Sequence, residues 1–322
     1  MTADPVSRED RIRLMGLSGV TLPPPVSTGD RVGVAALSGP VDPAILERGL
    51  EAIRELGFEP VPADNLHLHK GLFAGSDDER LAAFHHLAAD PSVRAILFTR
   101  GGHGSLRLLP RIDWSALAAV PRAYVGYSDL TPFLLQVVFR LGLVAFHGPM
   151  VAGDLARGLE SEEWASLERA LAGDYPGSVC LEQVGGEEAV EGPLLGGCLS
   201  LLTATLGTPF APDLSGSILF WEDVNEPLYR IDRMLNQLAL SGSLSRISGM
   251  VIGKLELTGE ETGGPDLRTV VQEIADRPDC PVAWGCPSGH CRPNMTLPLG
   301  LKARLDPHRN VLELGPANAA RT

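Results

Sequence analysis

The sequence lacks any apolar run that approaches the roughly 20 residues needed to span a bilayer. Its first residues, MTADPVSREDRIRL, are polar and mixed in charge, and they lack the basic start and apolar middle of a secretory signal. Basic residues are also scarce, since 27 Lys and Arg stand against 40 Asp and Glu, for a formal net charge of −13. Nucleic acid requires a basic face. These absences predict a cytoplasmic protein that binds neither membrane nor nucleic acid.

Signals for metals and cofactors are also missing. The five cysteines are scattered and include no CxxC pair, which is typical of reduced, structural thiols. His67 and His69 could form a metal pair, but no carboxylate or thiol stands near them at ligand spacing. No GxGxxG motif follows the first predicted strand, so a dinucleotide site is unsupported. We therefore predict no metal and no cofactor.

In the first half of the sequence, apolar strands and helices alternate regularly. This alternation predicts a parallel sheet covered by helices on both faces, as in Rossmann and flavodoxin-like domains. The expected strands are 31–37, 58–63, 95–99, 123–127 and 143–149, and the expected helices are 43–56, 77–89 and a segment that begins near 130.

The second half is richer in predicted strands. Its expected strands are 217–223, 247–255, 280–285, 295–297, 301–305 and 311–314, and its expected helices are 198–206, 227–240 and 266–275. A chain of 322 residues is natural for two domains. We predict a lead-in over 1–29, an N-terminal α/β domain over 30–152, a polar linker with one helix (161–171) over 153–190, and a β-rich C-terminal α/β domain over 191–318.

Ser128 stands where the apolar run 123–127 stops and a helical pattern begins. This predicts a strand, a sharp turn and a helix, with the hydroxyl exposed at the carboxyl end of the strand. The amide of Asp129 should point toward the same space, and this geometry suits a nucleophilic hydroxyl. Ser and Asp are also the usual helix caps, so the turn taken alone favours a simple cap over a nucleophile.

Other turns are predicted at the same edge of the sheet. Parallel sheets bind ligands at the carboxyl ends of their strands. Ser38, the glycine turn at Gly101 and Gly102, and His147 all follow predicted strands. Their convergence with Ser128 favours a ligand site over a simple cap. His103 and His147 lie near this edge, and either could contact substrate.

A serine nucleophile needs a base and a group that orients the base. His290 is a candidate base because it follows a strand and Gly289 in a loop, although a loop histidine bonded to backbone fits that position as well. Glu222 and Asp223, at the end of a strand, are the candidate orienting carboxylates. Acidic residues placed before a helix for its dipole would give the same pattern.

Three ordered motifs make the chain resemble the LD-carboxypeptidases, a serine peptidase family that includes the microcin C self-immunity hydrolases. The motifs are GYSDLT at 126–131, FWEDVNEPLYRIDRML at 220–235 and SGHCRPNMTLPLG at 288–300. The segments TRGGHGSLRLLPRID, FHGPM and GGCLSLLTATLGTP agree with them. The resemblance runs from about residue 30 to 315, nearly the whole chain.

The resemblance implies a triad of Ser128 as nucleophile, His290 as base and Glu222 as the carboxylate that orients it. It further implies an oxyanion hole from the amide of Asp129 and the glycine turn, with Gly102 as the expected donor. The implied reaction is acyl transfer without metal, at a site formed where the two domains meet.

The activity implied is a carboxypeptidase that cuts between an L-centre and a terminal D-amino acid, as in the trimming of murein tetrapeptides during peptidoglycan recycling. An amidase of the microcin-immunity type, acting on peptidyl- or aminoacyl-nucleotides, is the alternative, and a binding protein that has lost the chemistry is a third. Members of the family are commonly homodimers. Three departures from the family pattern bear on substrate fit: His103 in place of a tyrosine, Cys198 in place of an asparagine, and Trp221 in place of an aliphatic residue.

Overall fold

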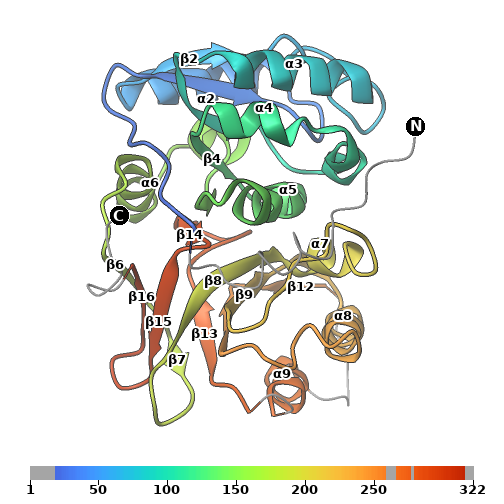
Figure 1. The fold of residues 1–322 in the computed structure, drawn as a ribbon, viewed down its shortest axis with the longest axis vertical. Helices are drawn as coiled ribbons and strands as arrows, with labels where there is room; N and C mark the ends of the chain where they lie inside the picture. Colours follow the sequence, from blue (N-terminus) through green and yellow to red (C-terminus); the bar gives the residue numbers. More distant parts are fainter. Residues whose placement is uncertain (1–18, 259–265, 277–278, 316–322) are drawn as a thin grey trace.

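The computed structural model describes residues 19–258, 266–276 and 279–315 of the chain. Figure 1 shows two α/β units, one above the other. One unit is built on a six-stranded sheet and the other on an eight-stranded sheet. The predicted fold class, a parallel-sheet first half followed by a β-rich α/β second half, is confirmed. Within the described ranges, every helix is too short or too polar to cross a bilayer.

The first sheet has the strand order β14-β5-β4-β3-β1-β2. Strands β1 to β5 run parallel, in the 2-1-3-4-5 order of a flavodoxin-like sheet, and β14 is antiparallel to β5. The bounds are β1 Arg31–Ala35, β2 Glu59–Pro62, β3 Val93–Phe98, β4 Ala123–Gly126, β5 Ala145–His147 and β14 Leu297–Leu299.

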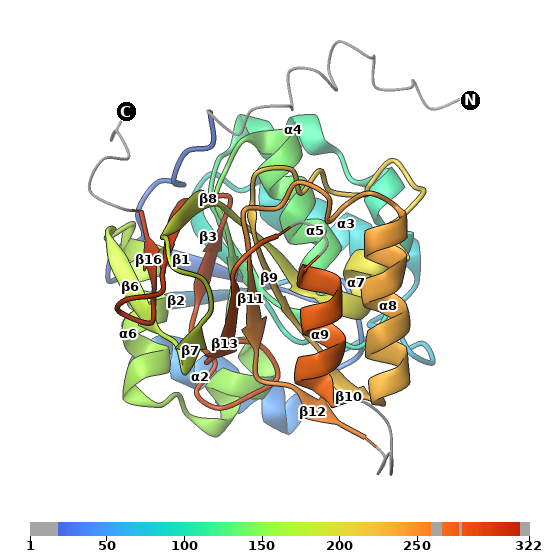
Figure 2. The ribbon, with the colours of Figure 1, turned by 90° about the horizontal axis from the view of Figure 1, so that it is seen from below.

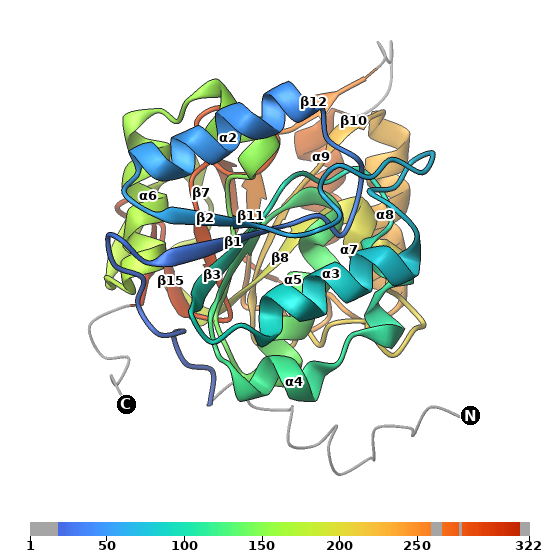
Figure 3. The same ribbon diagram turned by 90° about the horizontal axis from the view of Figure 1, so that it is seen from above.

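Helices cover both faces of this sheet, as Figure 3 shows: α2 and α6 lie on one side, and α3 and α4 on the other. Local caps fix their starts, because Asp42 accepts from the first amides of α2 and Ser76 forms a capping box with Glu79 in α3. The helix bounds are α2 Pro43–Glu55, α3 Asp77–Ala89, α4 Trp114–Ala119, α5 Thr131–Gln136, continued by a π-helical turn η4 Val137–Leu141, and α6 Ser161–Ala172.

The second sheet has the order β6-β16-β15-β8-β9-β11-β13-β7. Its centre, β8, β9, β11 and β13, is parallel, and its outer strands pair antiparallel. The bounds are β6 Gly177–Cys180, β7 Gln183–Val184, β8 Val190–Cys198, β9 Ile218–Glu222, β11 Gly249–Gly253, β13 Val282–Cys286, β15 Lys302–Asp306 and β16 Val311–Leu314. Strands β10 Val224–Glu226 and β12 Glu256–Leu257 form a separate two-stranded ribbon.

Three helices pack beside the parallel centre of this sheet, and Figure 2 shows α8 and α9 side by side there. Their bounds are α7 Leu199–Ala204, α8 Leu228–Leu240 and α9 Leu267–Ala275. Every residue of β9 is buried, and β9 lies in the middle of the sheet with β8 and β11 as its neighbours.

The chain crosses between the two units more than once. Strand β14 follows the second-sheet strand β13 in sequence, yet it pairs with β5 of the first sheet, with Leu297 opposite His147. Strands β6 and β7, which fall in the segment predicted as a linker, pair at the two edges of the second sheet. The predicted domain boundaries stay a prediction.

Candidate active site

Ser128 lies on a tight turn between β4 and α5. It begins the short 3-10 helix η3 (Ser128–Leu130) and has a left-handed φ of +61°, which is rare for a residue other than glycine. A Cβ built on Gly101 would lie 2.9 Å from the Oγ of Ser128, so the chain needs glycine at that close approach. Within this described segment, η3 and α5 both begin without a side-chain cap. The hydroxyl therefore faces the glycine turn and does not act as a helix cap.

Asp129 ties the neighbouring turns together through its buried side chain. Its Oδ2 accepts from the hydroxyl of Ser38, at 2.6 Å, and from the amide of Ser105, at 2.8 Å. Ser105 also donates its hydroxyl to the backbone oxygen of Asp129. The carboxylate is thus used in holding three turns at one edge of the sheet, and the backbone amide of Asp129 is the group left for other contacts.

Gly102 lies in the same turn with φ +107°. The turn is held against the end of β1, because the amide of Gly39 donates to the oxygen of Gly101 at 3.2 Å. A Cβ on Gly102 would come within 3.7 Å of Gly39. The structure thus places Gly101 directly against Ser128, and Gly102, the predicted oxyanion donor, next along the chain.

Glu222 and His290 are in direct contact, although 68 residues separate them. The Oε2 of Glu222 lies 2.6 Å from the Nδ1 of His290 and also accepts from its backbone amide at 3.0 Å. Glu222 is completely buried at the end of β9, whereas the side chain of His290 is 19% exposed.

The contact shifts the pKa of both groups. Burial on its own would raise the pKa of Glu222, but the hydrogen bond and charge of His290 outweigh burial, and the pKa is lowered. Burial would lower the pKa of His290, but the hydrogen bond and charge of Glu222 outweigh it, and the pKa is raised. The pair therefore favours a carboxylate beside an imidazole that binds a proton readily.

Two glycines make room for the Glu222 side chain. A Cβ on Gly289 would lie 2.4 Å from the Cγ of Glu222, and Gly289 has φ +104°. A Cβ on Gly253, at the end of β11, would lie 2.8 Å from the Cβ of Glu222. Distances below 3.0 Å cannot be accommodated without movement, so both positions require glycine.

Tyr127 connects the Ser128 turn to this pair. Its ring centroid lies 4.9 Å from that of His290 in an edge-on arrangement, across the boundary between the two units. The structure therefore brings the turn that carries Ser128 beside His290 and Glu222. Of the two candidate carboxylates only Glu222 bonds to His290, since Asp223 accepts from the amides of Ser200 and Val224 instead.

The other histidines named from the sequence have different surroundings. His147 is completely buried at the end of β5, and burial lowers its pKa to about 4. His103 is exposed and its ring lies 5.8 Å from that of Phe73. In residues 19–258, 266–276 and 279–315 there is no group of three or more His, Cys, Asp and Glu side chains arranged to hold a metal ion.

Asn294 and Glu163 support His290 and were not singled out from the sequence. Asn294 Oδ1 accepts from the amide of Gly289 at 2.9 Å, and Glu163 Oε1, on α6, accepts from the amide of Asn294 at 2.8 Å. Asn294 could have been found from the sequence, because it lies in the motif SGHCRPN that contains His290. Glu163 is 131 residues away from its partner, and no local pattern indicates it.

The units are also joined beside Ser128. Thr131 Oγ1 accepts from the amide of Cys198 at 3.0 Å, and a Cβ on Gly197 would lie 2.6 Å from that oxygen. The sulfur of Cys198 lies 3.6 Å from Oδ1 of Asp223. Contacts therefore run from the start of α5 to the end of β8 and on to the residue after Glu222.

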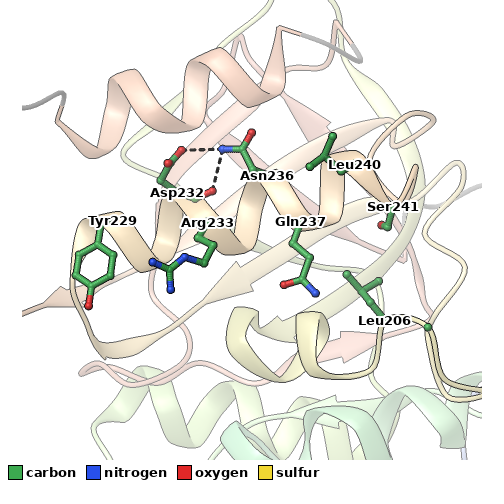
Figure 4. Close-up of a pocket in the computed structure, with 9 residues that line it drawn as sticks. Leu206, Tyr229, Asp232, Arg233, Asn236, Gln237, Leu240 and Ser241 are labelled. Carbon is green, nitrogen blue, oxygen red and sulfur yellow. Dashed lines mark hydrogen bonds between the residues drawn. The ribbon is translucent and has the colours of Figure 1, made fainter.

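An open groove lies away from this site, beside α8 (Figure 4). Asp232, Arg233, Asn236 and Gln237 contribute to its lining, together with Tyr229, Leu206 and Leu240. Asn236 bonds to the side chain of Asp232 at 2.8 Å. The groove contains none of the residues described above.

Comparisons with known proteins match most of the chain to LD-carboxypeptidases. Residues 32–148 match the LD-carboxypeptidase N-terminal domain and residues 191–305 match the LD-carboxypeptidase C-terminal domain. A probable murein peptide carboxypeptidase of Bacillus subtilis is 36% identical over 308 residues, covering 92% of this chain and 96% of that protein.

Solved structures give the same result. The muramoyltetrapeptide carboxypeptidase of Oxalobacter formigenes is 32% identical with a TM-score of 0.81, covering 88% of this chain and 97% of its own. The structure of the microcin C7 self-immunity protein MccF with glutamyl sulfamoyl guanosine is 26% identical with a TM-score of 0.85, covering 91% of this chain and 98% of its own.

Proposed function

The chain belongs to the LD-carboxypeptidase family, and from this premise we propose that it is a serine carboxypeptidase that removes a C-terminal D-amino acid from murein tetrapeptides. The observation that carries the proposal is the 2.6 Å contact between Glu222 and His290 beside the turn of Ser128. A carboxylate-bound imidazole next to a strained serine turn is the arrangement that acyl transfer requires.

In the proposed mechanism His290 acts first as base and then as acid. Its Nδ1 faces Glu222, so the Nε2 is the atom that takes the proton of Ser128 as the hydroxyl attacks the carbonyl carbon of the L-centre. The same proton passes to the departing amine of the D-amino acid, and an acyl-enzyme remains. Water then attacks the ester, with His290 again as base, and Ser128 is regenerated. Glu222 holds the ring and stabilises its cation.

The oxyanion of each tetrahedral intermediate needs donors near Ser128. The amide of Asp129 and the glycine turn, with Gly102 as donor, are the proposed groups. Their support is the position of the turn, since Gly101 packs directly against the Ser128 side chain. A single donor of this kind contributes about 3–4 kcal/mol to lowering the barrier.

The test is release of D-alanine from a murein tetrapeptide. The wild type should release it, and Ser128→Ala should lower kcat by about 10³-fold or more because no nucleophile remains. Ser245→Ala, at an exposed turn after α8, is the matched control and should keep full activity. A peptide ending in L-alanine should not be cut. Full activity in Ser128→Ala would contradict the proposed mechanism.

The second candidate is an amidase that acts on aminoacyl-nucleotide conjugates. It is favoured by the TM-score of 0.85 to MccF, whose structure was determined with glutamyl sulfamoyl guanosine. The same triad would serve, so the two candidates differ in substrate and not in mechanism. Parallel kcat/KM values for a tetrapeptide and an aminoacyl sulfamoyl nucleoside decide between them, and we expect the tetrapeptide to be preferred.

A binding protein without activity is the third reading, and a fluorophosphonate probe addresses it. Labelling that is lost in Ser128→Ala would show an active nucleophile. Action in the cytoplasm, a role in peptidoglycan recycling, a homodimer and independence from metals or cofactors complete the proposal, and they rest on the sequence and the family.

A further inference from the structure

His147 is a buried histidine that the proposed mechanism does not use. It ends β5 and is completely buried. Its ring centroid lies 5.6 Å from that of Tyr127 and 5.1 Å from that of Phe220. Phe220 and Glu222 are two residues apart on β9, so their side chains leave the same face of the strand. His147 therefore lies on the side of β9 from which the Glu222 carboxylate projects.

Three buried polar atoms at this place have no hydrogen-bond partner among the described residues. They are the Oε1 of Glu222 and both ring nitrogens of His147. Buried polar atoms are nearly always paired, with protein or with an ordered water. The other oxygen of Glu222, Oε2, accepts both of the bonds from His290. His147 also interacts electrostatically with both Glu222 and His290.

We propose that His147 is a positioning residue for the Glu222–His290 pair, and that a ring N–H of its neutral imidazole donates to the Oε1 of Glu222, directly or through one bridging water. This inference rests on the proposed function, because it concerns the base of that mechanism. It gives a partner to two atoms that otherwise have none, and it explains why a histidine occupies a buried strand end between two aromatic rings.

The consequence is that the donor lowers the pKa of His290, so the Glu222–His290 pair binds its proton less tightly. A donor at Oε1 stabilises the bare carboxylate more than a carboxylate that already faces an imidazolium. The donor therefore opposes the rise that Glu222 causes in the pKa of His290, and more of the base is free near neutral pH. His147 can do this without adding charge, since burial lowers its own pKa to about 4.

Other titratable and charged groups surround the pair and stay unchanged when His147 is replaced. Asp154 and Asp223 interact with His290, and Cys198 and Cys291 interact with Glu222. Tyr127 packs against the rings of both His147 and His290, and Arg157 and Lys254 interact with Tyr127 and Cys291, respectively. A shift measured in a His147 variant therefore reports the lost donor.

The experiment is an NMR titration of the His290 ring in the resting enzyme, with its signal identified by its loss in His290→Asn. In His147→Phe the pKa of His290 should rise by on the order of one unit, because the donor is gone. In His147→Gln, whose amide can still donate, the rise should be smaller. The acid limb of kcat/KM should move to higher pH by the same amount.

Tyr124→Phe is the matched control. It removes another buried polar atom that has no hydrogen-bond partner in the part of the chain that the structure describes. This atom comes from the neighbouring strand β4, away from the pair, so the variant should leave the His290 titration unchanged. Wild-type titration in a folded His147→Phe would overturn the inference. If that variant does not fold, a high-resolution crystal structure of the wild type decides. The inference is also overturned if that structure shows no ring nitrogen of His147, and no bridging water, within hydrogen-bond distance of Oε1 of Glu222. The titration needs no substrate, so it stands or fails separately from D-alanine release.

Discussion

The contact between Glu222 and His290 depends on the absence of a side chain at Gly289. In Gly289→Ala the new Cβ would lie 2.4 Å from the Cγ of Glu222, at φ +104°. We expect the carboxylate to move off His290, so that kcat falls about 100-fold. The strained backbone should also lower the free energy of unfolding by roughly 1–3 kcal/mol. Peptidase assays and denaturant unfolding measure the two effects.

Gly242→Ala separates the two effects. Gly242 has a comparable φ of +81°, but a Cβ there meets nothing within 4 Å. This variant should therefore lose a similar free energy of unfolding and keep its kcat. If both variants lost activity equally, the contact with Glu222 would not explain the effect at Gly289.

The charge of Glu222 sets the pH range in which His290 is a base. The pKa of His290 is raised, since the hydrogen bond and charge of Glu222 outweigh burial. Activity should therefore be lost as pH falls through a value above histidine's ordinary pKa of about 6.5. In Glu222→Gln the charge is gone, so the pKa of His290 should fall and the acid limb of kcat/KM should move to lower pH. We also expect kcat to drop by about 10³-fold.

Asp223→Asn is the control for that prediction. Asp223 also raises the pKa of His290, but through space and without a bond to the ring. Its loss should shift the acid limb downward by less than Glu222→Gln does. Equal shifts would show that the direct contact is not the main cause.

At the scale of elements, α6 holds the loop that carries His290. Buried Glu163 accepts from the amides of Asn294 and Glu160, and Ser166 accepts from the amide of Thr296 at 2.9 Å. Glu163→Ala leaves the Asn294 amide buried and unpaired, which should cost about 1–3 kcal/mol in the free energy of unfolding. Because Asn294 also accepts from Gly289, we expect kcat to fall about tenfold as the His290 loop loosens.

Glu162→Ala is a matched change on the same turn of α6. Glu162 is exposed, so both stability and kcat should stay near those of the wild type. Urea unfolding and kcat measured on the two variants test the role of α6. A stable and fully active Glu163→Ala would contradict it.

Elements with local signals could be predicted from the sequence. Helix α3 was predicted over its full extent, and α2 to within one residue, because their caps are encoded next to them. Strand β8 was missed because Gly192, Pro193, Gly196 and Gly197 are typical of a turn. They lie in a strand because of its neighbour: a Cβ on Gly196 would be 1.7 Å from the oxygen of Phe220 on β9. No local pattern contains that information.

In the candidate site, too, the features with local sequence signals could be predicted, and those that depend on distant contacts could not. The Ser128 turn could be predicted from an apolar run followed by a helical pattern, and the structure has β4, η3 and α5 there. The choice of Glu222 and His290 came from the family resemblance, since their contact spans 68 residues. The supporting role of Glu163 could not be predicted, because it depends on α6 lying against a segment 131 residues later. The catalytic roles themselves stay predictions.

At the scale of the whole molecule, the site needs the two units to be held in one arrangement. Strand β14 does this on one side of the site, by pairing with β5. On the other side α5, which starts three residues after Ser128, lies directly above β8 and α7 in Figure 1. The buried hydrogen bond from the Cys198 amide to Thr131 Oγ1 fixes that contact.

Thr131→Val tests whether this bond aligns the units. Valine has nearly the same shape but no acceptor, so the buried amide of Cys198 loses its partner. We expect the free energy of unfolding to fall by about 1–3 kcal/mol and kcat to fall severalfold as the start of α5 shifts. Thr131→Ser keeps the acceptor and should recover most of the kcat. Thr205→Val is the control, because Thr205 is also buried but its hydroxyl donates to the backbone oxygen of Leu202, at the end of the same helix. It should lose stability and keep kcat, so a loss of kcat in both variants would show that general destabilisation, and not alignment of the two units, explains the effect at Thr131.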